Sequence, residues 1–364
     1  MYQGKNLTEV LTELNQRQKA KRDFLVPAAD LRLEKGGQAI VMRGSAHQTE
    51  GGYTASRLFH SQLAEKTGIP MKYYTRMQAE QPDLLMENVN TWLDGMDSRF
   101  MVRCFVQPDT NAAQSDRAVR SARALLSDRY HRIDDLDVAS TALSVFAGQG
   151  NYEVVSSNVS EEHMHLKIVN NALEAEVRPG DYVQAGVVIS NSEVGCGAVS
   201  VRPFVVRLVC SNGMCADEFS TRKAHVGRIA RTLENSYELY SDETLEAMDK
   251  AFMLTLRDTA LAAIEEARFM QIVGKLRESA EARITGRVQD VVELAGKNWD
   301  LTRSEQDSIL QYLIEGGDLS LYGLSNAVTR ASQDADNYDR ATQLEGIGWQ
   351  AASMPSDLWR TING

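Results

Sequence analysis

The sequence contains little proline, little cysteine and no long run of apolar residues. Its 364 residues include seven prolines and four cysteines, and the absence of low-complexity tracts argues against a disordered chain. Nowhere do about eighteen uncharged apolar residues follow one another, so no membrane-spanning helix is expected. The first thirty residues are polar and lack the apolar core of a secretory signal. We therefore expect a cytoplasmic protein without a membrane partner.

The cysteines lack the spacing of a structural zinc site. Cys210 and Cys215 lie five positions apart, but no second pair of cysteines or histidines follows at the required distance. So few cysteines favour free thiols in a reducing compartment. We expect neither a metal nor another cofactor.

Recognisable catalytic motifs are also missing. The chain contains no phosphate-binding loop, no paired-histidine zinc motif, no nucleophile elbow and no dinucleotide fingerprint. The segment from Cys210 through Asn212 and Gly213 follows an apolar run, and Asn-Gly is typical of a tight turn. A nucleophilic Cys210 would need a partner base, and nothing in the neighbouring sequence fixes such a base beside it. The sequence therefore does not predict an enzyme.

What is present indicates an α+β protein in two parts. β-rich runs recur between residues 99 and 209, with an amphipathic helix predicted over residues 134–146. The runs between Tyr182 and Val209 are joined by segments too short for crossover helices, which favours an antiparallel sheet. From Leu245 to about Ile284, apolar residues recur every three or four positions, and Thr302 with Glu305 has capping-box spacing. We predict a mixed α+β domain over residues 1–232 and a helical, acidic region over residues 233–364.

The charge is divided unevenly between these parts. The net charge is -11, but residues 1–230 carry 26 Lys and Arg against 27 Asp and Glu, whereas residues 231–364 carry 13 against 23. The overall acidity counts against a dedicated duplex-DNA binder. A basic surface within the nearly neutral first part remains compatible with the sequence.

Basic side chains beside aromatic rings are the most suggestive feature of that first part. Arginines next to stackable rings suit single-stranded nucleic acid, whose phosphates need neutralising and whose bases stack on π faces. The competing interpretation is ordinary solvated surface. The candidate nucleic-acid-binding residues are Arg129, Tyr130, Arg132, Arg202, Arg207, Arg222, Lys223 and Arg228.

Two histidines form a weaker candidate. His163 and His165 are two apart on a predicted strand, so both side chains should point to one face. A carboxylate would complete a metal site, and Glu161 has the right parity. The favoured interpretation is a polar strand face turned to solvent, with Met164 and Leu166 inside.

Two segments resemble a known family. They are Asn191–Gly195, with Glu193 and Gly195, and Arg207–Met214, with Cys210, Asn212 and Gly213. The order of these and further segments is similar to the phage- and plasmid-encoded family called domain of unknown function 932, over roughly residues 50–350. The supporting segments are 62–64, 68–70, 73–74, 126–130, 323–329 and 338–342. The resemblance implies a mobile-element setting and carries over no active site.

Three functional hypotheses remain open. The first is a single-stranded DNA binder acting in replication, recombination or protection. The second is an anti-defence or regulatory protein that binds a host protein through its acidic helical surface. The third is an unrecognised enzyme using His163, His165 or Cys210. A homo-oligomer is compatible with all three.

Overall fold

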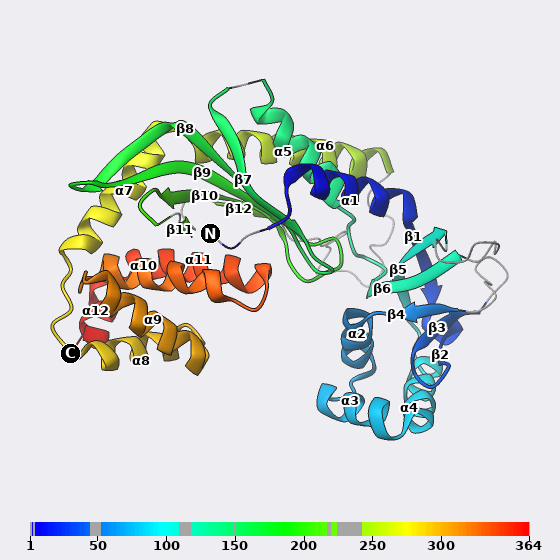
Figure 1. Cartoon of the computed structure of the whole chain (residues 1–364). Helices are drawn as coiled ribbons and strands as arrows, with labels where there is room; N and C mark the ends of the chain where they lie inside the picture. Colours follow the sequence, from blue (N-terminus) through cyan, green and yellow to red (C-terminus); the bar gives the residue numbers. More distant parts are fainter. Residues whose placement is uncertain are drawn as a thin grey trace.

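Two β-sheets and a set of C-terminal helices form the protein (Figure 1). The computed structural model describes residues 2, 4–43, 52–108, 118–148, 150–210, 212–216, 220–223 and 242–363, without the side chains of residues 221, 223 and 242–246. Both sheets are mostly antiparallel and the chain after residue 242 is helical, which confirms the predicted α+β class.

The first sheet has the strand order β1-β5-β6-β4-β3-β2. Its strands are β1 (Lys21–Pro27), β2 (Leu31–Glu34), β3 (Ala39–Met42), β4 (Tyr53–Ala55), β5 (Arg99–Pro108) and β6 (Ala118–Ser127). β4 pairs with β6 in parallel, and the other described pairings in this sheet are antiparallel. The helices that share its core are α2 (Arg57–Thr67), α3 (Met71–Glu80) and α4 (Pro82–Asp94). α2 ends at Gly68, whose φ of 70° is readily adopted only by glycine.

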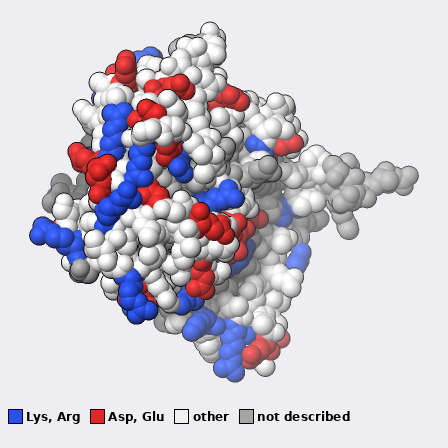
Figure 2. All heavy atoms as spheres, turned by 60° about the vertical axis from the view of Figure 1, so that its left-hand side comes forward, with Lys and Arg blue, Asp and Glu red and all other residues white. Residues whose placement is uncertain are grey.

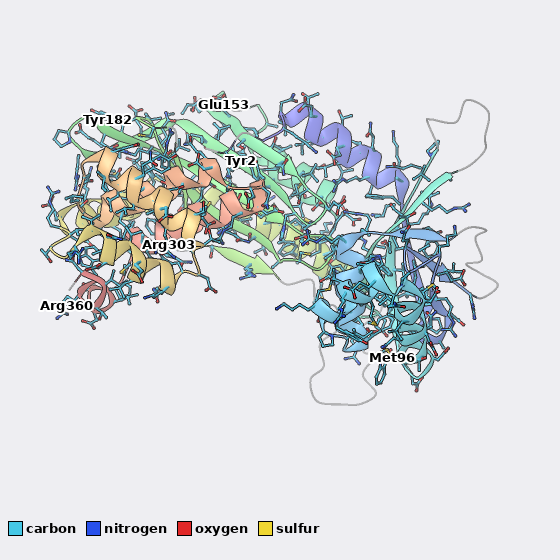
Figure 3. The ribbon with its side chains drawn as sticks, turned by 60° about the horizontal axis from the view of Figure 1, so that its bottom comes forward. Tyr2, Met96, Glu153, Tyr182, Arg303 and Arg360 are labelled. Carbon is cyan, nitrogen blue, oxygen red and sulfur yellow. The ribbon has the colours of Figure 1, made fainter. Side chains whose placement is uncertain are left out.

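The second sheet is an antiparallel meander with the order β11-β10-β9-β8-β7, and β12 pairs with the start of β10. Its strands are β7 (Tyr152–Val159), β8 (Met164–Arg178), β9 (Asp181–Asn191), β10 (Val199–Arg207), β11 (Asn212–Cys215) and β12 (Thr221–Lys223). Short turns join β8 to β9 and β9 to β10, so the prediction of an antiparallel sheet without crossover helices is confirmed. Met96 beside α4 and Tyr182 in β9 mark the two sheets on opposite sides of Figure 3.

Helices cover both faces of the second sheet (Figure 1). One face packs against α1 (Leu7–Ala20), α5 (Asp135–Phe146) and α6 (Asp242–Ala263) in a core that includes Leu166 and Leu256. The other face is covered by α11 (Tyr338–Ala352), which contacts His165 and Lys167 of β8. Together with α7 (Glu266–Glu281) and α10 (Leu321–Ala331), α11 also contributes to a further core beside β8, β9, β10 and β11. The sheet therefore lies in the middle of a helix–sheet–helix arrangement, and its polar residues on the second face are buried under α11.

The remaining helices pack on one another at the C-terminal end. They are α8 (Val288–Asn298), α9 (Arg303–Gly316) and α12 (Ser356–Asn363). The predicted capping box of Thr302 and Glu305 is present at the start of α9. The predicted helical stretch over residues 245–284 consists of two helices, because the chain breaks at Ile264 and Glu265 between α6 and α7.

The proposed boundary at residues 232 and 233 stays a prediction. The cores on both faces of the second sheet contain residues from either side of it, since α6 and α7 pack directly on the strands. Among the described residues, no helix combines the length and the apolar character needed to cross a membrane.

Candidate functional site

A row of polar side chains lies between the second sheet and α11. Alternation along β8 points Met164 and Leu166 into the core beneath α5 and α6, while His165 and Lys167 point towards α11. On α11, Asp339 and Glu345 lie nearly two helical turns apart and face the strand. The sheet and the helix together therefore bury four ionisable groups.

His163, His165 and Asp339 form one contiguous group. His165 Nε2 lies 2.9 Å from Asp339 Oδ1, and His163 Nδ1 lies 3.4 Å from Asp339 Oδ2. The two imidazole rings stack with centroids 5.6 Å apart. Ser190 Oγ lies 2.7 Å from His165 Nδ1, and the Ser160 hydroxyl donates to Asp339 Oδ2 at 3.1 Å.

Burial and the shared carboxylate set the protonation of this group. Burial of His165 outweighs its contact with Asp339 and lowers the pKa of His165 to about 4. Burial also disfavours charged His163, but Asp339 outweighs it and raises the pKa of His163. Hydrogen bonds from both rings overcome burial and lower the pKa of Asp339. At neutral pH, His165 is therefore a neutral imidazole and Asp339 a carboxylate.

The sequence prediction for this pair was right about its geometry and wrong about its environment. His163 and His165 do point to one face, but that face is not turned to solvent, because α11 covers it and leaves His165 only 5% exposed. The carboxylate is Asp339, not Glu161, which is exposed ahead of the strand. Asp339 lies 174 positions from His165, so no local spacing could have revealed it.

The neighbouring pair is an ion pair wholly removed from water. Lys167 Nζ donates to Glu345 Oε2 at 2.5 Å, and both side chains have no exposed surface. The Lys167 ammonium also lies 4.7 Å from the centroid of the Tyr338 ring. Burial opposes its charge, but Glu345 outweighs burial and raises the pKa of Lys167. With no accessible surface, this pair supports the fold and does not contact a ligand.

Two adjoining cavities open beside the histidines. One, of about 450 Å³, is lined by His163, His165 and Asp339. The other, of about 640 Å³, lies between α2, β6 and the loop after β9. The two share Cys196, Gly197, Ala198 and Arg222. Together they are lined by four cations, namely Lys66, Arg129, Arg202 and Arg222, against the carboxylates Glu65 and Asp339. We call these two cavities the cationic groove.

Half of the predicted nucleic-acid-binding residues meet in this groove. Arg129, Tyr130 and Arg222 line the larger cavity, and Arg202 and Arg222 line the smaller one. Tyr130 is largely buried, and its hydroxyl donates to the Ser192 carbonyl at 3.0 Å.

Two other predicted residues, Arg132 and Arg207, do not line the groove. Arg132 contacts Asp23 at 3.4 Å, and Arg207 donates through two nitrogens to Asp181 at 2.7 and 2.8 Å. Arg207 lines a different cavity of about 270 Å³, together with Cys210 and Asn212. Lys223 belongs to β12, opposite Val199, and Arg228 lies outside the described residues.

Glu193 joins the two sheets. Its carboxylate accepts hydrogen bonds from Arg123 of β6 at 2.6 Å and from the Asp135 backbone at 3.3 Å. Its backbone carbonyl accepts from Arg103 of β5 at 2.6 Å. Arg103 is itself wholly buried and also donates to Asp134 at 2.8 Å. This family-motif residue therefore anchors the loop after β9 to the first sheet.

Asp135 lies beside that junction as a buried acid. Its Oδ1 accepts a hydrogen bond from Asn191 Nδ2 at 2.8 Å. Burial, reinforced by the nearby charge of Glu193, raises the pKa of Asp135 to about 8. The acid is therefore largely protonated at neutral pH.

The other motif residues have structural contacts. Gly195 has a φ of 85°, and a Cβ there would lie 2.7 Å from Leu126 Cδ2. Asn212 is buried and accepts from Gln333 Nε2 at 2.7 Å. Gly213 of β11 pairs with Val206 of β10. Cys210 is exposed, and no general base contacts it among the described residues, which leaves it without the partner that nucleophilic catalysis needs.

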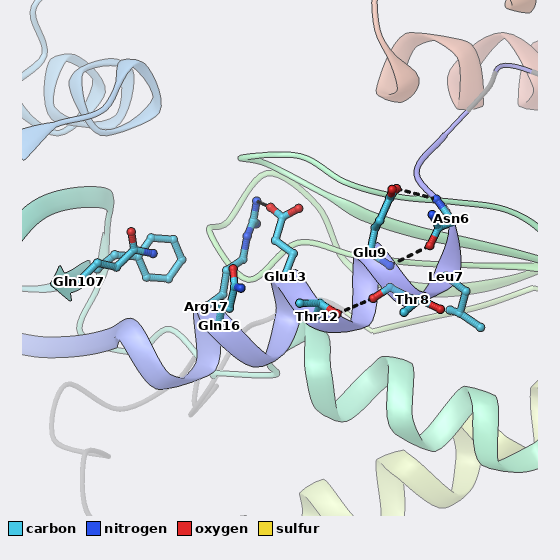
Figure 4. A pocket seen from close by; sticks show the side chains of 10 residues that line it. Asn6, Leu7, Thr8, Glu9, Thr12, Glu13, Gln16, Arg17 and Gln107 are labelled. Carbon is cyan, nitrogen blue, oxygen red and sulfur yellow. Dashed lines mark hydrogen bonds and ion pairs between the residues drawn. The ribbon is translucent and has the colours of Figure 1, made fainter. Parts of the chain in front are cut away.

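A further cavity lies elsewhere, along α1 (Figure 4). It measures about 900 Å³, but its polar side chains bind one another. Asn6 and Glu9 form a capping box, and the Glu13 carboxylate accepts from Arg17 at 2.6 Å. These groups therefore stabilise the helix and its start, whereas in the lining of the cationic groove four cations outnumber two carboxylates.

The acidic helices carry much of their charge as ion pairs. On the face drawn in Figure 2, Lys and Arg side chains lie beside Asp and Glu. Within the helices, Lys297 contacts Glu293 at 3.0 Å and Arg360 contacts Asp357 at 2.6 Å. Such exposed pairs are weak, but they divide the acidity of this region into small patches.

These features define an α+β protein with two mainly antiparallel sheets and a polar groove between them. A model of the family described as domain of unknown function (DUF932) matches residues 122–345, which is more than half of the chain, and the protein belongs to that family. The matched range contains the histidines, Asp339, Glu193 and three of the four groove cations. Searches of curated proteins and of solved structures found no match.

Proposed function

We propose that the cationic groove binds the phosphate backbone of single-stranded nucleic acid. The observation that carries this proposal is the gathering of Lys66, Arg129, Arg202 and Arg222 around two adjoining cavities of a chain whose net charge is -11. Against an acidic background, a local concentration of positive charge supplies a reason for a polyanion to bind there.

The number of cations supports a single strand over a duplex. Duplex-binding domains are usually basic overall, whereas this chain is acidic and its basic groove is short. Proteins that bind single strands use positively charged grooves that follow the nucleic-acid backbone. The affinity for a single strand depends less on salt, per phosphate contacted, than the affinity for a duplex. Four contacts predict a slope of log affinity against log salt of about -3.

The family resemblance supports a biological setting for this activity. Binding of single strands would suit replication, recombination or protection of the DNA of a mobile element, the setting that the sequence resemblance implies. This setting belongs to the proposal.

Fluorescence anisotropy of a labelled oligothymidylate at low and moderate salt tests the proposal. We expect saturable binding that weakens with salt. Arg129→Gln combined with Arg222→Gln should weaken binding by about tenfold or more and lower the salt slope by about 1.4, because two of the four phosphate contacts are removed.

The matched control is Arg287→Gln combined with Arg360→Gln, which removes the same charge from residues that line neither cavity. Arg360 lies at the far end of the molecule (Figure 3). Binding by this control should stay within about twofold of the unmodified protein, since long-range effects of exposed charges are screened by salt. An equal loss in both double variants, or no binding at low salt, would refute the proposal.

A further inference from the structure

We infer that His163, His165 and Asp339 form a binding site for one divalent transition-metal ion. Two imidazole nitrogens and a carboxylate oxygen are a donor set that suits Zn²⁺, Mn²⁺, Fe²⁺ and Co²⁺, and it discriminates against Ca²⁺ and Mg²⁺, which prefer oxygen ligands alone. Proteins of unrelated folds use such a set with further coordination positions open.

The distances fit this assignment. With metal–ligand bonds of about 2.1 Å, neighbouring ligand atoms lie roughly 3.0–3.4 Å apart in octahedral or tetrahedral geometry. His165 Nε2 lies 2.9 Å from Oδ1 of Asp339, and His163 Nδ1 lies 3.4 Å from Oδ2 of the same carboxylate. One candidate ligand atom from each residue lies within 4.8 Å of the others, so small movements of the side chains bring the three atoms to coordination distance.

Contacts behind the ligands hold them in place. Ser190 Oγ lies at the second ring nitrogen of His165, which leaves Nε2 as the ligating atom, and Ser160 donates to Asp339. Outer contacts of this kind orient metal ligands and increase their affinity. Gly197 lies against His163, where an added Cβ would be 3.1 Å from Nε2, so the absence of a side chain leaves room for the ring.

The site faces an open cavity and not a closed core. All three residues line the cavity of about 450 Å³ that they share with Arg202 and Arg222. Three protein ligands leave positions for water or for a ligand oxygen, as in metal sites that act on a substrate. The positive charges of Arg202 and Arg222 repel a metal ion that has only neutral ligands besides Asp339. They favour a negatively charged oxygen as a further ligand of the metal. The site therefore suits a metal ion that contacts an anion in the groove.

Isothermal titration of the chelator-treated full-length protein with Zn²⁺ and with Co²⁺ tests the inference, and the visible absorption of Co²⁺ reports its coordination. We expect one equivalent of metal to bind. His163→Ala and Asp339→Asn should each weaken binding by at least about 100-fold, since even the loss of an outer contact costs about 10–100-fold.

The control is His131→Ala, which removes an imidazole that contacts Asp249 and lines neither cavity. Its metal affinity should be unchanged. The unmodified protein decides the question even if a variant misfolds: no saturable binding of either metal overturns the site, as does unchanged binding by folded His163→Ala protein. Because the probe is the metal alone, this result is independent of whether oligonucleotides bind.

Discussion

The buried pair of Lys167 and Glu345 allows a quantitative test of how the second sheet is held to α11. Both side chains are completely buried and 2.5 Å apart. Replacing Lys167 by Met removes the ammonium and leaves the Glu345 carboxylate in the same dry position. Breaking a buried pair in this way costs about 3–5 kcal/mol, most of it from the uncompensated charge. We expect Lys167→Met to lower the free energy of unfolding by that amount.

The double variant separates this penalty from the value of the pair. Lys167→Met with Glu345→Met replaces both charges by apolar groups, and such exchanges are often neutral or stabilising. The double variant should therefore recover most of the stability lost by the single one. With Glu345→Met as the second single variant, the loss in the double variant should be smaller than the sum of the two single losses by about 3 kcal/mol or more.

Urea unfolding at neutral pH, followed by tryptophan fluorescence, measures these changes. Trp349 lies on α11 itself, is 2% exposed and belongs to the core between this helix and the sheet, so its emission reports the contact under test. The control is Lys297→Met, which breaks the exposed pair with Glu293 and should cost about 0.5 kcal/mol or less. A loss below about 1 kcal/mol for Lys167→Met, or a double variant as unstable as the sum of its parts, would refute the reasoning.

Two further predictions concern the junction between the sheets. The pKa of Asp135 is raised from an ordinary value of 3.8 to about 8 in the folded protein. The protonated Asp135 side chain therefore contributes its full stabilisation below about pH 4, and this stabilisation is lost as the pH rises to about 8. Asp135→Asn mimics the protonated acid, so its stability relative to the unmodified protein should increase between pH 5 and pH 8.5, by at most about 1.4 kcal/mol per pH unit; a constant difference would contradict this. Gly195→Ala should cost about 2–4 kcal/mol, because it combines backbone strain with a contact of 2.7 Å to Leu126. Gly180→Ala, at φ 81° with no atom within 4 Å of the new Cβ, isolates the backbone term and should cost about 1 kcal/mol; equal losses would show that the Leu126 contact is unimportant.

Local patterns predicted the elements of this fold well. The β-rich runs of β8, β9 and β10 and their short turns indicated the antiparallel meander, and Thr302 with Glu305 marked the start of α9. These features depend on residues a few positions apart, where the 2.0 and 3.6 periodicities act. The break between α6 and α7 was missed because the apolar repeat continues through it.

The candidate site was predicted only in part, because its contacts cross the chain. The spacing of His163 and His165 correctly placed both on one face, but burial of that face depends on α11, which follows more than 170 positions later. Arg207 and Arg222 were equally plausible as sequence candidates. Only the fold pairs the first with Asp181 and brings the second to the wall shared by both cavities.

The loop after β9 connects the family-motif residue Glu193 to the cationic groove. Glu193 anchors the start of this loop to Arg123 of the first sheet. A few residues later, Cys196, Gly197 and Ala198 form the wall common to both cavities. The motif thus links the relative position of the two sheets to the shape of the cationic groove. Residues that bind no ligand can in this way control where the cations and the histidines lie, since a site is only as well ordered as the contacts that support it.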